Sequence, residues 1–182
     1  MPRYVAFLRG INLGKRRVAM SRLKSVTEEL GYSEVETFIA SGNVLFSAPK
    51  SETSVFESAL ARHLESRLGF EVDTFVRRFD DVARIAQTKA FPQDGDEGIT
   101  IHVAFLHEAL PKKTATALAA IRTDYDEFRV SGTEFYWLCH GGISDSKVWS
   151  LPEAKALQLP SSTMRNIKSL RKLVQKHGTT AP

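Results

Sequence analysis

Cysteine is almost absent from this chain of 182 residues, in which Cys139 is the only one. A single thiol excludes an internal disulfide and leaves too few cysteines for a structural zinc site. The five histidines show no metal-ligand spacing, and Cys139 with its neighbour His140 lacks the third partner that would mark a nucleophile. We therefore expect neither a metal nor a cofactor.

Long apolar runs are missing as well. No window approaches the roughly 18 apolar residues that a bilayer-spanning helix needs. Residues 1–8 show no long apolar run followed by a cleavage site, so we expect no secretory signal. Together with the single cysteine, these absences predict a cytoplasmic protein with no membrane partner. The oligomeric state stays open.

Acidic residues are missing from both ends of the chain. Residues 1–24 contain seven cations and residues 160–182 contain five, while all 21 acids lie in residues 25–159. The net charge is only +4, but basic ends that flank an acidic middle can reflect an anionic partner. Ordinary solvated surface charge is the alternative explanation.

The order of apolar runs and turn signals in the first 77 residues predicts the split βαβ, or ferredoxin-like, unit. Residues 3–8 are apolar on both faces, which predicts a central strand. Gly42 lies in a tight-turn signal between two short β-rich runs. The expected elements are a strand at 3–8, a helix from 19 to 31, strands at 35–40 and 43–47, a helix reaching 68, and a strand at 72–77.

The rest of the chain repeats this order less regularly. The expected elements are a helix at 80–90, a strand at 99–106, a helix at 111–121, a hairpin of 127–131 and 134–139, a short segment at 145–151, a helix at Pro152, and a helix at 163–177. We therefore predict an α/β (α+β) fold with two ferredoxin-like βαββαβ-type halves, 1–78 and 79–182. The second half is modified and includes a C-terminal helix. We expect the two halves to form one compact unit.

This topology brings two loops together. In a βαββαβ unit, the loop after the first strand and the hairpin between the second and third strands lie at the same end of the sheet. Loop 9–17 and turn 41–43 should therefore converge. Their convergence would place five polar residues in one neighbourhood: Arg9, Asn12, Lys15, Ser41 and Asn43.

Loop 9–17 has the general composition of a phosphate-binding P-loop but departs from its pattern. A P-loop has four residues between its glycines and a Ser or Thr after its lysine. Here three residues separate Gly10 from Gly14, and Arg16 follows Lys15, so we expect no nucleotide hydrolase. A glycine-rich loop before a helix still favours an anion. Alternatively, the glycines only satisfy positive φ angles.

The helix expected from Thr163 carries the second basic feature. Arg165 and Asn166 would lie in its first turn, where a cation opposes the helix dipole unless an anion or acid is present. A solvated helix face is the alternative explanation for the basic side. The basic side of this helix comprises Arg165, Lys168, Lys172 and Lys176.

Catalytic and RNA-binding signatures are weak. Residues 144–147 contain the Ser-x-x-Lys spacing of penicillin-recognising enzymes without the companion motifs, so we expect a capped turn. Residues 43–47 do not match the octapeptide signature of the common RNA-recognition module. Any contact with nucleic acid would therefore be mainly electrostatic and sensitive to salt.

Three segments, residues 8–14, 41–46 and 163–166, are similar to those of a known family. They resemble the arginine-glycine-isoleucine-asparagine loop, the serine-glycine-asparagine turn and the threonine-x-arginine-asparagine segment of the bacterial family called domain of unknown function 1697. Ile167 stands where that family often has an aromatic residue, and Lys15 where it often has a second glycine. The resemblance implies a small, cytoplasmic, bacterial α/β protein and no established activity.

We predict that the protein binds an anionic ligand, either nucleic acid or a phosphorylated small molecule. Arginines would pair with phosphate oxygens while asparagines fix the orientation. The predicted ligand-binding residues are Arg9, Asn12, Lys15, Ser41, Asn43, Arg165 and Asn166. A second hypothesis is a small-metabolite enzyme that uses the same pocket, with Ser41, Ser162 or Thr163 handling a proton. A third is a ligand-free structural or interaction module, in which Asn and Arg side chains tie loops together.

Overall fold

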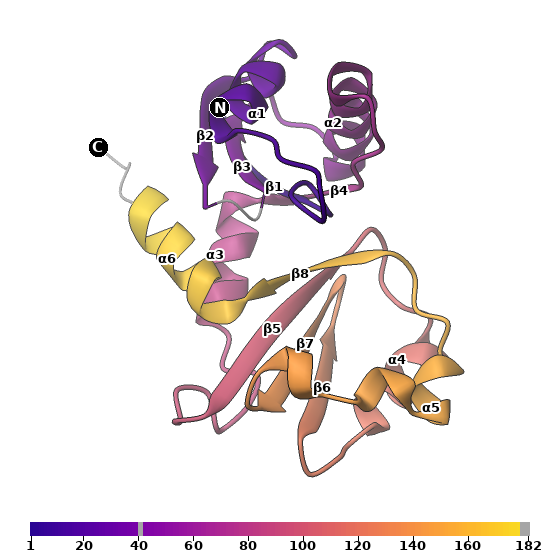
Figure 1. Ribbon diagram of the computed structural model, residues 1–182. Helices are drawn as coiled ribbons and strands as arrows, with labels where there is room; N and C mark the ends of the chain where they lie inside the picture. Colours follow the sequence, from indigo (N-terminus) through magenta and orange to yellow (C-terminus); the bar gives the residue numbers. More distant parts are fainter. Residues whose placement is uncertain (40–41, 179–182) are drawn as a thin grey trace. The chain divides into compact units, whose positions relative to one another are not determined.

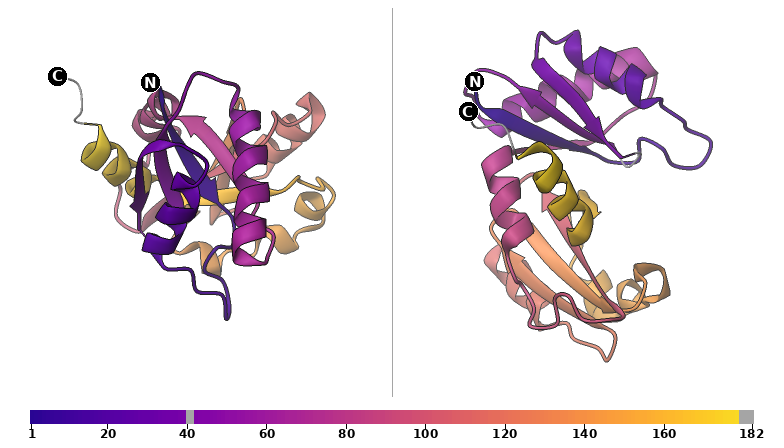
Figure 2. Two further views of the ribbon diagram at one scale, coloured as in Figure 1. Left: turned by 90° about the horizontal axis from the view of Figure 1, so that it is seen from above. Right: turned by 90° about the vertical axis from the view of Figure 1, so that its left-hand side faces the viewer.

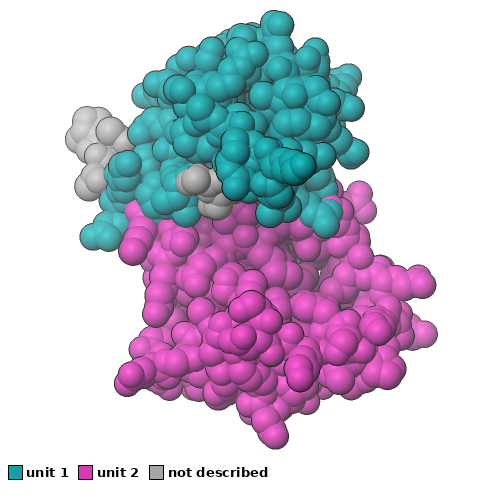
Figure 3. Space-filling model, viewed as in Figure 1, with its two compact units in different colours: residues 1–85, 173–182 teal, residues 86–172 magenta. Residues whose placement is uncertain are grey.

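The computed structural model of the protein describes residues 1–39 and 42–178. The chain forms two compact units (Figure 3), which we call unit 1, Met1–Ile85 with Leu173–Pro182, and unit 2, Ala86–Lys172. Each unit contains one four-stranded sheet. Ser41, which was predicted as a ligand-binding residue, lies outside the described residues.

Unit 1 has the expected element order βαββαβ, followed by one further helix. Its strands pair only antiparallel, in the order β2-β3-β1-β4. The elements are β1 (Arg3–Leu8), α1 (Met20–Glu28), β2 (Ser33–Phe38), β3 (Asn43–Ser47), α2 (Thr53–Leu68), β4 (Thr74–Arg78) and α3 (Phe79–Gln87).

The core of unit 1 forms around β1, which lies between β3 and β4. Tyr4 and Ala6 point to one face of the sheet and belong to a buried cluster with residues of both α1 and α2. The two helices therefore cover the same face (Figure 1, Figure 2). Val5 and Phe7 point to the other face and are also fully buried. This burial on both faces explains why residues 4–8, which follow Arg3 on this strand, are apolar throughout.

Unit 2 repeats the strand arrangement of unit 1. Its sheet has the order β6-β7-β5-β8, and every pair is antiparallel. The elements are β5 (Ile99–Leu106), α4 (Lys112–Ala120), β6 (Asp126–Ser131), β7 (Glu134–His140), two 3-10 turns (Ile143–Asp145 and Val148–Ser150), α5 (Pro152–Lys155), β8 (Ser162–Asn166) and α6 (Ile167–His177). The last part of α6, from Leu173, belongs to unit 1.

The core of unit 2 lies between its sheet and two helices. Leu118 of α4 and Ala154 of α5 belong to one buried cluster with Phe128 and Trp137 of the sheet. The four-residue α5 and the two 3-10 turns stand between β7 and β8, where unit 1 has the long helix α2. The second repeat of the fold is therefore modified at this connection.

The predicted fold class is confirmed, because the protein is mixed α/β with two four-stranded antiparallel sheets and covering helices. One predicted element is wrong at its start. The C-terminal helix begins at Ile167 rather than Thr163, and the four residues before Ile167 belong to β8. Arg165 therefore lies on a strand, and the basic side of the helix begins at Lys168.

Two kinds of feature are absent from the part of the chain that the structure describes. Within residues 1–39 and 42–178, no helix combines the length and the apolar character needed to cross a membrane. In the same residues, no three His, Cys, Asp or Glu side chains gather into a group that could hold a metal ion.

Candidate functional site

Loop 9–17 and the turn that ends at Asn43 converge in unit 1, as the topology predicts. The Leu8 amide donates a hydrogen bond to the Gly42 carbonyl at 2.8 Å. A Cβ atom on Gly42 would lie 2.6 Å from Ile11 Cγ2 and 3.2 Å from Leu8 Cβ, so the two segments are in direct contact. Gly42 also has a φ of +81°, which strongly favours glycine.

Internal hydrogen bonds determine the shape of loop 9–17. Asn12 Oδ1 accepts a hydrogen bond from the Val18 amide at 2.8 Å, which closes the loop. The guanidinium of Arg17 donates to the carbonyls of Gly14 at 3.0 Å and Arg16 at 2.8 Å. One predicted side chain, Asn12, therefore holds the loop in one shape together with Arg17, which was not predicted as a ligand-binding residue.

The cations of this loop differ in their surroundings. The Arg16 guanidinium lies over the Phe70 ring, 4.4 Å from its centroid, in cation–π geometry. Lys15, Arg16 and Arg17 are exposed, and none of them forms an ion pair within the described part of the chain. Arg9 is also exposed, and its amide donates to the Asp73 carbonyl at 2.9 Å. The loop therefore presents positive charge to solvent.

Asn43 holds the turn rather than facing solvent. Its side chain is 2% exposed, and Nδ2 donates to the Phe38 carbonyl at 2.9 Å. Because Phe38 ends β2 and Asn43 begins β3, this hydrogen bond joins the two ends of the connecting turn. Asn43 therefore supports the turn that contacts loop 9–17.

Arg165 is a buried cation in unit 2. It lies on β8 opposite Val103 of β5, and its Nη1 donates to Thr163 Oγ1 and to the Met164 carbonyl, both at 2.8 Å. Both acceptors are uncharged, and burial lowers the pKa of the Arg165 guanidinium to about 10. The side chain was predicted to bind a ligand from a helix terminus, whereas the structure places it on β8, an edge strand of its sheet.

Asn166 caps the C-terminal helix. Its Oδ1 accepts a hydrogen bond from the Lys168 amide at 2.8 Å, so the side chain satisfies one of the free amides at the start of α6. All three predicted asparagines, 12, 43 and 166, thus bond to nearby backbone groups. This pattern is the one expected from the hypothesis that they tie segments together.

The predicted site residues are divided between the two units. Unit 1 holds Arg9, Asn12, Lys15 and Asn43, and unit 2 holds Arg165 and Asn166. Within unit 1, the structure brings loop 9–17 and Asn43 to the same end of the sheet, through the Leu8–Gly42 contact. Within unit 2, Arg165 and Asn166 are neighbours on β8.

The sequence of residues 1–136 matches the family model described as "Protein of unknown function (DUF1697)". The chain belongs to DUF1697. The family resemblance inferred from the sequence motifs is therefore confirmed, and the match includes the loop and turn motifs, whereas residues 163–166 lie beyond it. No curated protein matches this DUF1697 chain.

A solved structure shares the fold of this DUF1697 chain. It is described as the structure of conserved bacterial protein SP0830 from Streptococcus pneumoniae. The two chains superpose with a TM-score of 0.75 over 98% of this chain and 99% of the other, at 22% sequence identity. At this identity the likeness shows a common fold.

Sequence reasoning missed a buried carboxylate in unit 2 of this DUF1697 protein. Asp126 is 2% exposed, and its Oδ1 accepts hydrogen bonds from Trp137 Nε1 at 2.8 Å and Ser146 Oγ at 2.7 Å. Its Oδ2 accepts from Thr123 Oγ1 at 3.0 Å. Asp126 therefore joins β6, β7 and the irregular connection that replaces a long helix. An acid at the start of a largely polar strand (DEFRVS) gives no signal of this role in the sequence.

Cys139 lies beside this carboxylate. Its Sγ is 3.7 Å from Asp126 Oδ1, and burial, followed by the charge of Asp126, raises the pKa of the thiol to about 12. The thiolate that nucleophilic chemistry needs is therefore disfavoured at neutral pH. This fits the sequence-based expectation that Cys139 is no nucleophile.

A second unexpected cluster attaches the end of α6 to the sheet of unit 1. Arg3 donates to the His177 carbonyl at 2.9 Å through Nη1, and its Nη2 pairs with Glu36. His177 Nδ1 lies 3.1 Å from the other oxygen of Glu36. Burial lowers the pKa of His177, while Glu36 acts in the opposite direction. These contacts explain why residues from Leu173 group with unit 1.

Acidification is expected to weaken unit 2 through His102 of β5. Burial lowers the pKa of His102, and its Nδ1 is buried with no hydrogen-bond partner among the described residues. The folded protein therefore favours the neutral ring. This contribution to stability is complete above the ordinary histidine pKa of about 6.5 and is lost as the pH falls toward the lower folded value.

Urea denaturation monitored by tryptophan fluorescence checks this pH dependence, because Trp137 and Trp149 both lie in unit 2. The urea concentration at the denaturation midpoint should decrease as the pH is lowered from 7 to 5. A His102→Gln variant should show a smaller decrease. If His102→Gln kept the whole pH dependence of the midpoint, this dependence would come from another titratable group.

Proposed function

We propose that this DUF1697 protein binds a phosphate-bearing anion, either a nucleic acid or a phosphorylated small molecule, at loop 9–17 of unit 1. The observation that carries the proposal is a loop with three consecutive exposed cations and a shape held by its own hydrogen bonds. A preformed loop loses little conformational entropy on binding, and its three consecutive exposed cations, Lys15, Arg16 and Arg17, attract phosphate. The proposed site is basic before the ligand arrives.

The roles of the predicted residues in this proposal follow from their contacts. Arg9 and Lys15 are exposed and serve as the phosphate contacts, with Arg16 held beside them by the Phe70 ring. Asn12 and Asn43 act as positioning residues, because one closes the loop and the other joins the ends of the adjacent turn. Arg165 and Asn166 belong to unit 2 and are not needed for binding at this loop.

Two alternatives are weighed by the same contacts. A ligand-free module is favoured by the asparagine hydrogen bonds, and it predicts no binding at the loop. The enzyme hypothesis assigned a proton transfer to Ser41, Ser162 or Thr163. Of these, Thr163 Oγ1 accepts a hydrogen bond from Arg165. A guanidinium has no lone pair to take up a proton, so this contact adds no base. The binding function therefore stands as the proposal.

Charge reversal at Lys15 tests this function. Lys15→Glu is expected to weaken binding of a fluorescent single-stranded 12-mer of mixed sequence by about 10-fold at low salt, since a charge-assisted phosphate contact is lost. Lys50→Glu makes the same charge change at another exposed position of unit 1 and should change the affinity by less than about 2-fold. Fluorescence anisotropy measures both affinities.

Competition separates the two ligand classes. ATP that displaces the oligonucleotide at micromolar concentration would favour a phosphorylated small molecule, and displacement only at millimolar concentration would favour nucleic acid. Equal loss of affinity in Lys15→Glu and Lys50→Glu would contradict the proposal that loop 9–17 is the binding site. No binding of either ligand would favour the ligand-free module.

A further inference from the structure

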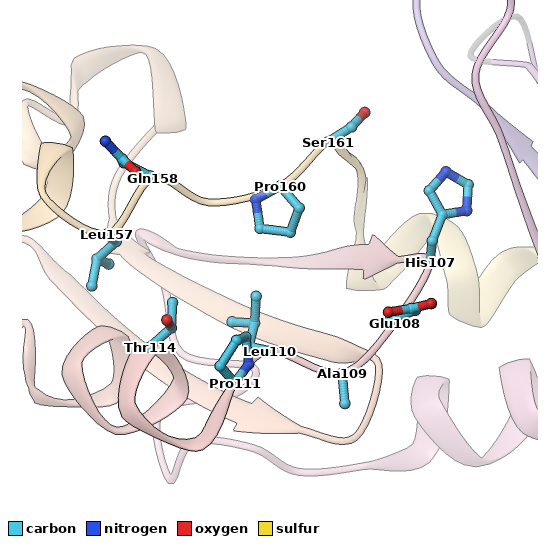
Figure 4. A pocket seen from close by; sticks show the side chains of 10 residues that line it. All are labelled: His107, Glu108, Ala109, Leu110, Pro111, Thr114, Leu157, Gln158, Pro160 and Ser161. Atoms are coloured by element: carbon cyan, nitrogen blue, oxygen red, sulfur yellow. The ribbon is translucent and has the colours of Figure 1, made fainter.

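A cavity of about 530 Å³ lies in unit 2, where β5 and β8 separate (Figure 4). The two strands are paired as far as Leu106 and Ser162. Beyond this pair the chain after β5 turns into α4, and the chain before β8 arrives from α5. Residues 107–111 and 157–161 therefore form two walls, and α4 closes the space between them.

The walls of this cavity are apolar in the middle and polar at the rim. Figure 4 shows the Pro160 ring and the Leu110 side chain pointing toward each other across the hollow, with His107 at one end and Gln158 at the other. The ten lining residues are His107, Glu108, Ala109, Leu110, Pro111, Thr114, Leu157, Gln158, Pro160 and Ser161. An apolar interior with a few polar groups is typical of a small-molecule site.

The walls are held in place by the core and by the backbone. Leu110 is 7% exposed and belongs to the buried cluster of unit 2, against which Leu157 also packs. Pro111 and Pro160 have a fixed φ, which limits the motion of each wall. Gln158 adopts a φ of +47°, an unfavourable conformation for a residue with a side chain. Such strain gathers at ligand sites, where the surrounding structure maintains it.

The charge of the lining selects the kind of ligand. None of the ten lining residues is Lys or Arg, and Glu108 is the carboxylate among them. An anion would meet no lysine or arginine among these ten residues, in contrast to loop 9–17. A cationic or neutral polar group beside Glu108 would donate a hydrogen bond to its carboxylate, which can only accept.

We propose that this cavity binds a small molecule with an apolar ring or short chain and a cationic or neutral polar end, which lies beside Glu108. The apolar part occupies the space between Leu110, Leu157 and Pro160. The volume of about 530 Å³ is of the size found for ligand pockets of roughly 300–1,000 Å³. This proposal does not depend on phosphate binding at loop 9–17.

Three probes that share one ring test the proposal with the full-length protein: benzylamine, benzyl alcohol and benzoate. Titration of each into ¹⁵N-labelled protein, followed by amide chemical shifts, should give dissociation constants on the order of millimolar for such small molecules. The shifts should concentrate on the amides of residues 108–114 and 157–161. Benzylamine should bind about 3-fold more tightly than benzoate, because an exposed charge contact contributes little more than this.

Matched variants locate the site and its charge preference. Thr114 of α4 lines the cavity, whereas Thr116 on the same helix is exposed and does not line it. Thr114→Phe should fill the cavity and abolish the shifts, while Thr116→Phe should keep them. Glu108 lies on an exposed loop. Glu108→Gln should reduce the preference for benzylamine over benzoate without changing the affinity for benzyl alcohol.

Three results would overturn the proposal. The first is the absence of shifts at residues 108–114 and 157–161 with every probe at about 20 mM, a concentration well above the dissociation constants expected for such ligands. The second is unchanged shifts in a folded Thr114→Phe protein. The third is benzoate binding as tight as that of benzylamine. Should Thr114→Phe fail to fold, the charge preference and its loss in Glu108→Gln still decide the outcome.

Discussion

Replacing Asp126 by alanine is expected to lower the free energy of unfolding of unit 2 by about 3–4 kcal/mol. The carboxylate accepts hydrogen bonds from the side chains of Trp137, Ser146 and Thr123 in a nearly fully buried position. Alanine would leave these donors without their acceptor, and each buried donor left unsatisfied costs roughly 1–3 kcal/mol. It would also leave a small cavity next to the Trp137 ring.

Urea denaturation followed by tryptophan fluorescence measures this loss in unit 2, which holds both tryptophans. Asp124→Ala is the matched control, because Asp124 is exposed two residues away and should change stability by less than about 0.5 kcal/mol. A loss below about 1 kcal/mol in Asp126→Ala would mean that water replaces the carboxylate easily and that the network has little structural weight.

Gly42→Ala is expected to destabilise unit 1 by about 3 kcal/mol. The new Cβ would lie 2.6 Å from Ile11 Cγ2, so either the turn or loop 9–17 has to move. A left-handed backbone costs a residue with a side chain roughly 1–2 kcal/mol, and overpacking adds roughly 1–3 kcal/mol. The displaced loop should also bind oligonucleotide less tightly.

Gly69→Ala separates these two effects. Gly69 ends α2 with a φ of +78°, close to that of Gly42, but nothing lies within 4 Å of the position of its missing Cβ. It should therefore show only the backbone cost of about 1 kcal/mol. Hydrogen exchange of β1 and β3 amides reports on unit 1. Equal losses in the two variants would contradict the close packing of Gly42 on Ile11.

Much of the fold could be predicted from the sequence, because hydrophobic spacing and glycine positions agree with each other. Residues 4–8 are apolar without alternation, and β1 is indeed buried on both faces from Tyr4 onward. The helix expected to reach residue 68 does end there as α2, with Gly69 beyond it in the left-handed conformation. Local signals of this kind are reliable where sequence pattern and tertiary packing favour the same element.

The start of the last helix could not be predicted because Met164 fits two patterns. It lies three residues before Ile167 and therefore extends the apolar stripe of the helix toward the N-terminus. It also alternates with Thr163 and Arg165, which is the pattern of β8. Pairing with β5 satisfies the backbone of this segment and decides in favour of the strand.

The location of the candidate site could be predicted better than the roles of its residues. The contact of loop 9–17 with the turn follows from strand order alone, and it is observed between Gly42 and Ile11. An asparagine that binds a ligand and one that bonds to nearby backbone look the same in a sequence. In the structure, the side chains of Asn12 and Asn43 both bond to nearby backbone groups.

The salt dependence of oligonucleotide binding tests the central claim, that loop 9–17 binds phosphate, most directly. A loop that binds phosphate should bind the phosphate backbone of an oligonucleotide at low ionic strength, whatever its natural ligand. With about three phosphate contacts, from Arg9, Lys15 and Arg16, the logarithm of the binding constant should fall with the logarithm of salt concentration with a slope of about −2, and Lys15→Glu should lessen this slope. Absence of binding at about 20 mM salt, or the same slope in Lys15→Glu, would contradict the claim.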